Sequence, residues 1–206
     1  MDLKTNNKEQ LILEVAEKLF IEKGYTGTKT TEIAENAGVN HALLHYYYRT
    51  KENLFTQIFE QKASQLLGSF SLNIDNNCPF FEKIKDTIEI HFDFLNKNPK
   101  LPLFILREIV ADKNRKAFIL KNLLPAGKEM HQKLKAAVRK EIRKGVIRPV
   151  KTIDLLLGIV SLNVFAFVAA QLFFDTDDEA DREKLRIFLE ERKRNNVELI
   201  LNSLKP

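Results

Sequence analysis

Apolar residues recur at spacings of three and four along almost the whole chain, and few stretches alternate in the way that strands do. This periodicity predicts an all-α protein. Gly24 is expected to stop the first helix in a left-handed conformation, and a polar loop is expected over 73–77. The predicted helices cover about 7–23, 31–37, 41–48, 51–70, 79–98, 152–174 and 179–204.

Two of these helices are separated only by Gly38, Val39 and Asn40, and so tight a break is typical of a helix-turn-helix. Gly38 can adopt a positive φ, and Asn40 can cap the helix over 41–48. We expect Ile33, Val39 and Leu44 to pack between the two helices. The helix over 41–48 would then lie along the major groove of DNA, with its outer face exposed.

The helix over 41–48 carries two His and three consecutive Tyr. Leu44 and Tyr48 are four residues apart and are expected on its inner face. A Tyr hydroxyl can donate to a phosphate, and His can do the same or reach a base edge. The residues expected on the outer, DNA-contacting face are His41, Ala42, His45, Tyr46 and Tyr47.

Lys51 supports a phosphate contact independently of these rings. If Thr50 caps the next helix, Lys51 occupies its first position, where the positive end of the helix dipole disfavours a cation by up to about 1 kcal/mol. A nearby phosphate would reverse this effect, whereas an ordinary solvated lysine is the alternative. Thr30 is expected to cap the helix over 31–37 in the same way.

The segment from Ile12 to Phe55 resembles the N-terminal domain of the TetR/AcrR family. It carries, in order, A-x-x-L-F-x-x-x-G-Y from Ala16, I-A-x-x-A-G-V from Ile33, L-x-Y-Y-Y from Leu44 and T-K-E-N-L from Thr50. The resemblance implies a dimeric, ligand-controlled transcriptional regulator, in most cases a repressor. It implies a helix-turn-helix DNA-binding domain over 1–50 and a larger helical domain over 51–206 for ligand binding and dimerisation.

The resemblance also implies roles for single residues. Thr28 and Lys51 match positions that usually hold phosphates, Tyr46 matches an aromatic residue that often contacts the DNA backbone, and Asn40 matches the usual cap. Where the family commonly has Lys-Gly-Thr-Leu-Tyr, this chain has His-Ala-Leu-Leu-His over 41–45. Individual base contacts therefore cannot be carried over. The DNA-binding set expected from pattern and resemblance is Thr28, Thr30, Asn40, His41, Ala42, His45, Tyr46, Tyr47 and Lys51.

The C-terminal part is rich in Phe, because fourteen of the fifteen Phe follow residue 50 and the chain has no Trp. An apolar interior with a few orienting polar groups is typical of a small-molecule pocket. His91 interrupts an apolar helix face, which indicates either a core histidine with a hydrogen-bond partner or a ligand contact. The residues expected around a pocket for an unidentified effector are Phe59, His91, Phe92, Phe104, Phe118, Asn163 and Phe167; Phe165 is expected to converge with them.

The helix over 152–174 is apolar on every side. Asp154, Asn163 and Gln171 would be expensive inside a bilayer, so we expect no membrane span. A helix of this kind needs cover on every side, which a core and a protein interface together provide. With the amphipathic helix over 179–204 it is expected to form the contact of a homodimer.

The net charge of +5 is unevenly spread. Residues 1–67 hold eight Lys and Arg against nine Asp and Glu, whereas 128–151 hold nine against two on an expected long helix. This basic run favours a solvated face over a binding site. Cys78 is the one cysteine and the N-terminus lacks a secretory pattern, so we expect a cytoplasmic protein without disulfides.

Two other classes of function compete with a regulator. An adaptor with the same fold and weak or absent DNA binding is an alternative, because the N-terminal segment is nearly neutral. An enzyme is disfavoured because the sequence offers no phosphate loop or paired carboxylates, and we expect no cofactor. His41 and His45 are four residues apart, but no third metal ligand accompanies them, so no metal site is expected.

Overall fold

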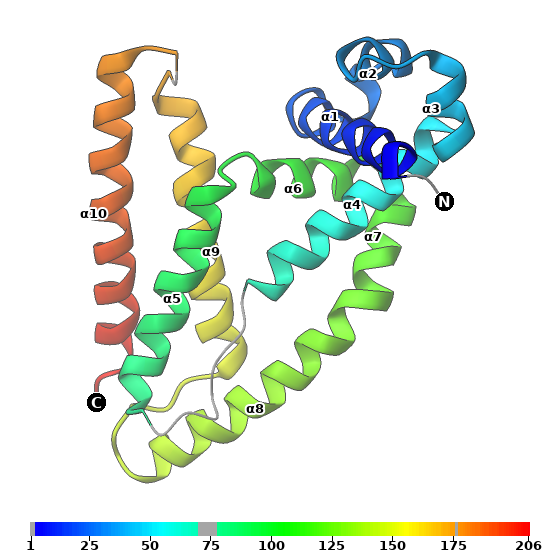
Figure 1. Ribbon diagram of the computed structural model, residues 1–206. Coiled ribbons are helices and arrows are strands. Elements are labelled where there is room, and N and C mark those ends of the chain that lie inside the picture. The colour runs from blue at the N-terminus through cyan, green and yellow to red at the C-terminus, as the bar shows by residue number, and fades with distance from the viewer. Residues whose placement is uncertain (1–2, 70–77, 176) are drawn as a thin grey trace. The chain divides into compact units, whose positions relative to one another are not determined.

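The computed structural model describes residues 3–69, 78–175 and 177–206, and this part of the chain is helical without strands (Figure 1). The all-α prediction is therefore confirmed. The loop predicted over 73–77 lies outside the described residues. The helices are α1 (Leu3–Gly27), α2 (Thr30–Asn36), α3 (His41–Tyr48), α4 (Lys51–Gly68), α5 (Phe80–Lys97), α6 (Leu101–Ala111), α7 (Lys113–Phe118), the π-helical η1 (Ile119–Leu123), α8 (Leu124–Arg143), α9 (Thr152–Phe173) and α10 (Glu179–Leu204).

These helices form two compact units. Of the described residues, those within 1–65 and 103–118 form the first unit, and those within 66–102 and 119–206 form the second. The first unit thus joins the three N-terminal helices and most of α4 to a segment, 103–118, that is distant in the sequence.

The first unit is built around an aromatic core. The ring centroids of Phe20 and Phe55 lie 4.9 Å apart, and those of Phe59 and Phe104 lie 6.3 Å apart. All four side chains are buried. The apolar faces of α1 and α4 meet there, which fixes the helix that begins at Lys51 against the N-terminal helices.

Gly24 interrupts α1 as predicted, because its φ is 71° and its ψ is 179°. A short helical turn then continues to Gly27, so the helix extends beyond the predicted end at Lys23. A Cβ at residue 24 would lie 2.8 Å from Nη2 of Arg107, which is the far end of a flexible side chain and can move, so the positive φ is what requires glycine.

The second unit contains α5, α9 and α10, which lie side by side in Figure 1. Their common core combines Ile84 and Ile88 of α5 with residues of α9 and α10, and α8 contributes Leu134 and Val138. The basic run predicted on a long helix lies partly on α8, which ends at Arg143, and partly on the segment that follows it.

The apolar helix α9 has one buried face and one exposed face. By length and composition alone it could cross a membrane. In the structure its buried face belongs to the core of the second unit, while the other face leaves large apolar side chains in solvent. The exposed apolar residues of α9 are Ile153, Leu157, Val160, Phe165, Leu172 and Phe173.

Candidate nucleic-acid interface

The turn between α2 and α3 has the predicted geometry. Gly38 has a φ of 60°, and Oδ1 of Asn40 accepts a hydrogen bond from the backbone N–H of Leu43 at 2.8 Å. This bond satisfies one of the free amides at the start of α3. Ile33 and Leu44 are buried and Val39 is half-buried between the helices, so the helix-turn-helix rests on a small apolar contact and one cap.

The side chains of α3 divide between two faces as predicted, except that Tyr47, expected on the outer face, is half-buried. Tyr48 is buried, and its hydroxyl donates to the backbone oxygen of Glu9 at 3.2 Å. Tyr46 is 75% exposed, and its ring lies edge-on to that of Tyr47 with 5.4 Å between the centroids. The other residues exposed on the outer face are His41, Ala42 and His45.

The predicted cap of α2 is wrong. Thr30 is the first helical residue, and Lys29 occupies the cap position without a side-chain hydrogen bond. The Thr30 hydroxyl instead lies 3.1 Å from Nε2 of His41. This contact joins the start of α2 to the start of α3, so Thr30 and His41 stand together at one edge of the candidate interface.

Thr28 does not present its side chain at the surface. It is 1% exposed, and its hydroxyl donates to the backbone oxygens of Gly24 at 2.8 Å and Leu19 at 3.2 Å. The hydroxyl stabilises the turn that follows the break in α1 and has no proton left to donate to a phosphate. The expectation that this side chain faces DNA is corrected, and we leave Thr28 out of the candidate interface.

The N-terminus of α4 is capped as predicted, because the backbone N–H of Asn53 donates to Oγ1 of Thr50 at 3.1 Å. Lys51 is the first residue of α4, and its Nζ lies 4.3 Å from the centroid of the Tyr25 ring. Partial burial lowers the pKa of Lys51 below its ordinary value, and the neighbouring carboxylate of Glu52 offsets only part of this shift. The ammonium group thus stands at a position where an added anion would stabilise it.

Two arginines of this unit were missed by the sequence interpretation. Arg49 ends α3 with a φ of 59°, which is unusual for a residue other than glycine, and its side chain is exposed. A basic residue directly after three Tyr was the available signal. Arg115 of α7 is buried against Tyr25 and Phe55, and no sequence pattern near it indicated that contact.

The residues expected around an effector pocket occupy both units. In the first unit, the Phe59 ring contacts those of Phe104 and Phe118, at centroid distances of 6.3 and 6.4 Å. In the second, the rings of Phe92 and Phe167 lie 4.9 Å apart. The expectation that Phe165 joins them is wrong, since this side chain is 65% exposed.

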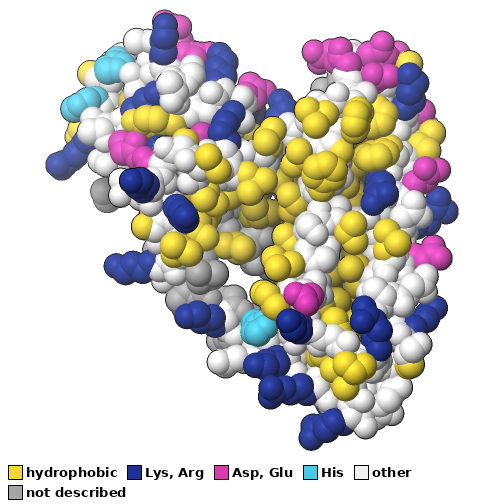
Figure 2. All heavy atoms as spheres, turned by 180° about the vertical axis from the view of Figure 1, so that it is seen from behind, with side chains coloured by type: hydrophobic (Ala, Val, Ile, Leu, Met, Phe, Trp, Pro, Cys, Tyr) yellow, Lys and Arg dark blue, Asp and Glu magenta, His cyan; other side chains and the backbone are white. Residues whose placement is uncertain are grey.

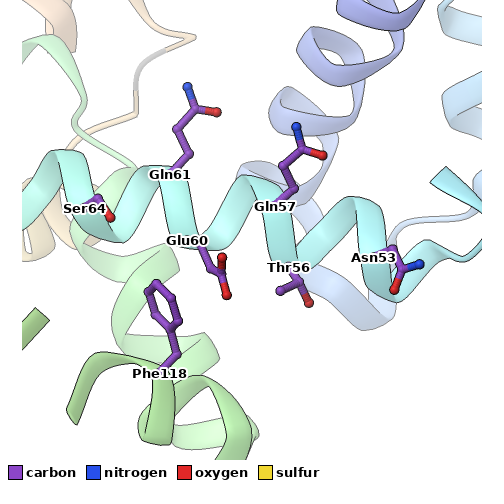
Figure 3. Close-up of a pocket in the computed structure, with 7 residues that line it drawn as sticks. All are labelled: Asn53, Thr56, Gln57, Glu60, Gln61, Ser64 and Phe118. Atoms are coloured by element: carbon purple, nitrogen blue, oxygen red, sulfur yellow. The ribbon is translucent and has the colours of Figure 1, made fainter. Parts of the chain in front are cut away.

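A groove of about 570 Å³ lies along the polar face of α4, and of the expected pocket residues Phe118 lines it. Figure 3 shows the side chains of Glu60 and Phe118 turned toward each other there, while those of Gln57 and Gln61 project from α4 in the opposite direction. The complete lining is Asn53, Thr56, Gln57, Glu60, Gln61, Ser64 and Phe118.

His91 and Asn163 belong to a buried polar network in the second unit. The Nδ2 of Asn163 donates to the backbone oxygen of Ile88 at 2.9 Å and lies 3.1 Å from Nδ1 of His91. Its Oδ1 accepts from Nδ2 of Asn196 at 3.0 Å, and Asn196 accepts from Arg192 at 3.0 Å. Burial lowers the pKa of His91 to about 4. His91 is therefore a neutral core histidine with a hydrogen-bond partner.

No group of three or more potential metal-binding His, Cys, Asp or Glu occurs among the residues that the structure describes. His41 and His45 are both exposed on α3.

Residues 12–58 match the family model described as bacterial regulatory proteins, tetR family. The fatty acid metabolism regulator protein of Bacillus subtilis is 24% identical over 84% of this chain and 80% of its own length. The nucleoid occlusion factor SlmA of Mannheimia succiniciproducens is 29% identical over 46% of this chain, and the match spans only 44% of that protein.

Among solved structures, the TetR family transcriptional regulator PfmR from Thermus thermophilus superimposes with a TM-score of 0.67. The match covers 95% of this chain and 99% of PfmR at 22% identity. At 22% identity, this likeness shows the fold alone.

Proposed function

Because the chain belongs to the tetR family of bacterial regulatory proteins, we propose that it is a cytoplasmic transcriptional repressor. In this proposal it binds a pseudo-palindromic operator as a homodimer and is controlled by a small-molecule effector. Its helix-turn-helix is a DNA-binding fold, and the family regulates transcription. The operator, the dimer, the effector and the direction of regulation are the proposed parts.

The arrangement of α3 and the start of α4 supports the proposed DNA binding. The outer face of α3 exposes His45 and Tyr46 side by side with His41, and Lys51 stands at the N-terminus of α4. In a helix-turn-helix the second helix enters the major groove, where Tyr and His can reach phosphates and base edges. These rings lie exposed on the outer face of α3 and not in the core. Contact with DNA is the best explanation for their exposure.

The exposed face of α9 supports the homodimer. Leu157 and Val160 lie on one face of the helix, and Phe165 and Leu172 continue this face toward its C-terminus. Figure 2 shows hydrophobic side chains gathered on the side of the second unit that carries α9. Exposed apolar surface of this extent favours contact with another protein, and a second copy offers the same face in a symmetric contact.

Control by an effector requires only that the effector binds two states of the dimer with different affinity. Fatty acids are the first candidates, because the Bacillus subtilis relative that aligns over 84% of this chain is named a fatty acid metabolism regulator. An effector that prefers a dimer whose two DNA-binding units no longer match the half-sites would release the operator.

The proposal is tested by fluorescence anisotropy of the purified protein with labelled DNA from the region beside its own gene, at two salt concentrations. Saturable binding that weakens with salt supports the regulator. Release by added fatty acid supports effector control, while unchanged binding removes that part only. Failure to bind this DNA or a random genomic library would overturn the DNA role and favour an adaptor.

A further inference from the structure

Three segments that are far apart in the sequence meet at the ring of Tyr25 in the first unit. Lys51 Nζ lies 4.3 Å from the ring centroid, and Cζ of Arg115 lies 4.8 Å from it. Tyr25 follows the break in α1, Lys51 begins α4, and Arg115 belongs to α7. Two side-chain cations thus contact the same aromatic ring, and each is attracted to the negative charge on the ring face.

Arg115 is firmly anchored on its own side of this cluster. Its Nη1 donates to Oε2 of Glu108 at 2.6 Å, and both side chains are buried. Glu108 also accepts a hydrogen bond from the backbone N–H of Tyr25 at 3.3 Å. The guanidinium group lies 4.1 Å from the centroid of the Phe55 ring. Glu108 and Arg115 therefore hold both the backbone and the ring of Tyr25.

Glu52 closes the cluster from the side of α4. Its carboxylate lies 3.6 Å from Nη2 of Arg115. Burial raises the pKa of Tyr25, and the neighbouring side chain of Glu52 raises it further. The Nε of Arg115 is buried and has no hydrogen-bond partner.

Among the described residues Lys51 forms no ion pair, and its Nζ lies over the Tyr25 ring. A lysine at the first position of a helix is free to move through many rotamers unless something holds it. The contact with Tyr25 restricts the ammonium group to the N-terminal end of α4, where the helix dipole attracts anions.

We propose that Tyr25 and Arg115 are positioning residues that hold the Lys51 ammonium for contact with a DNA phosphate. The proposal rests on the proposed function, because it assumes that Lys51 contacts the DNA backbone. It gives the segment 103–118 an indirect part in DNA binding, through Lys51, although that segment lies far from the helix-turn-helix in the sequence. A shift of α7 away from Tyr25 would release Lys51 and weaken binding.

The test measures operator affinity at several salt concentrations for wild type, Lys51→Ala, Tyr25→Leu, Tyr25→Phe and the double variant Tyr25→Leu/Lys51→Ala. Each lost phosphate contact is expected to weaken binding about tenfold and to reduce the slope of log affinity against log salt by about 0.9. Lys51→Ala removes one contact from each protomer of the proposed homodimer, so it should reduce the slope by about 1.8. Tyr25→Leu should weaken binding severalfold with a reduced slope, whereas Tyr25→Phe keeps the ring and should stay within about twofold of wild type.

The double variant separates positioning from a structural effect. If Tyr25 acts through Lys51, Tyr25→Leu/Lys51→Ala binds no more weakly than Lys51→Ala alone. Thermal melting of each variant establishes the temperature at which all are folded, and binding is compared there. Full additivity of the two substitutions, or an unchanged salt slope in Tyr25→Leu, would overturn the proposal.

Arg115 is tested together with its buried partner, because removing one member alone leaves an uncompensated charge. Glu108→Gln/Arg115→Met should reproduce the weakened binding and reduced slope of Tyr25→Leu, and Arg115→Lys, which keeps a cation over the ring, should lie closer to wild type. If wild type fails to bind DNA, the proposed function fails and this proposal with it. If Lys51→Ala weakens binding while these variants do not, only the positioning roles are wrong.

Discussion

Asn163 and His91 are joined inside the second unit by a contact of 3.1 Å between Nδ2 and Nδ1. Since the amide nitrogen can only donate, Nδ1 of His91 must accept, and the ring must be neutral for this bond to form. A lone histidine on an apolar face of α5 is thus explained by a partner on α9. The pair ties two helices of the core together and gives the stability of this unit a dependence on pH.

Stability is expected to fall between pH 6.5 and pH 4 because of His91. Its pKa is about 4 in the folded protein, against 6.5 as its ordinary value. The unfolded chain therefore binds more protons than the folded chain in this window. As a result, the free energy of unfolding should be lower at pH 5 than at pH 8 by roughly 2 kcal/mol. Urea unfolding at both pH values measures this. His91→Gln, which keeps an acceptor for Asn163, should remove most of the difference, while His45→Gln on the exposed face of α3 should not.

Removal of the Asn163 amide is expected to be strongly destabilising. Asn163→Ala takes away the partner of His91, of Asn196 and of the backbone oxygen of Ile88 at once. Each buried polar group without a partner costs about 1–3 kcal/mol, so a loss of at least about 3 kcal/mol is expected in chemical denaturation. Asn195→Ala, at an exposed position of α10, is the matched control, and an equal effect there would contradict the account of the network.

The cap of α3 is expected to contribute about 1 kcal/mol to stability. Asn40→Ala removes the acceptor for the Leu43 amide, whereas Asn40→Ser can replace it. We expect faster hydrogen exchange in the first turn of α3 for the Ala variant and near-normal exchange for the Ser variant. Equal protection in wild type and Asn40→Ala would show that the cap has no role.

The exposed face of α9 is expected to determine the oligomeric state. Leu157→Glu places a charge at the proposed contact and should raise the dissociation constant of the dimer by at least about tenfold. Sedimentation velocity over a range of concentrations measures it. Ile90→Glu, at an exposed apolar position of α5, is the control and should leave the dimer intact. A monomeric wild type, or an unaffected Leu157→Glu variant, would place the dimer contact elsewhere or exclude it.

Local features of the first unit were predictable because short segments determine them. The Asn40 cap, the positive φ of Gly38 and the inward turn of Tyr48 follow from spacing and side-chain chemistry within a few residues. The cap of α2 was not predictable from its own segment, because the Thr30 hydroxyl instead contacts His41, eleven residues away. The sequence does not show which of two possible partners a hydroxyl will bind.

Contacts over long sequence separations were not predicted, because the local sequence around a polar residue does not show which distant residue it will contact. Glu108 reaches the backbone of Tyr25 across 83 residues, and Asn163 reaches Asn196 across 33. Periodicity placed Asn163 on a buried helix but could not show which amide or ring it meets. Thr28 matched a position that holds phosphates in related proteins, yet its hydroxyl bonds to the turn after Gly24.

The central claim, that the outer face of α3 distinguishes one DNA sequence from another, is tested most directly by a specificity ratio. This is the affinity for the bound intergenic fragment divided by the affinity for a scrambled fragment of equal length and composition. The variant His45→Ala should lower the ratio at least tenfold with little change in binding to scrambled DNA. A ratio equal to that of wild type, in a variant that remains folded, would contradict the claim.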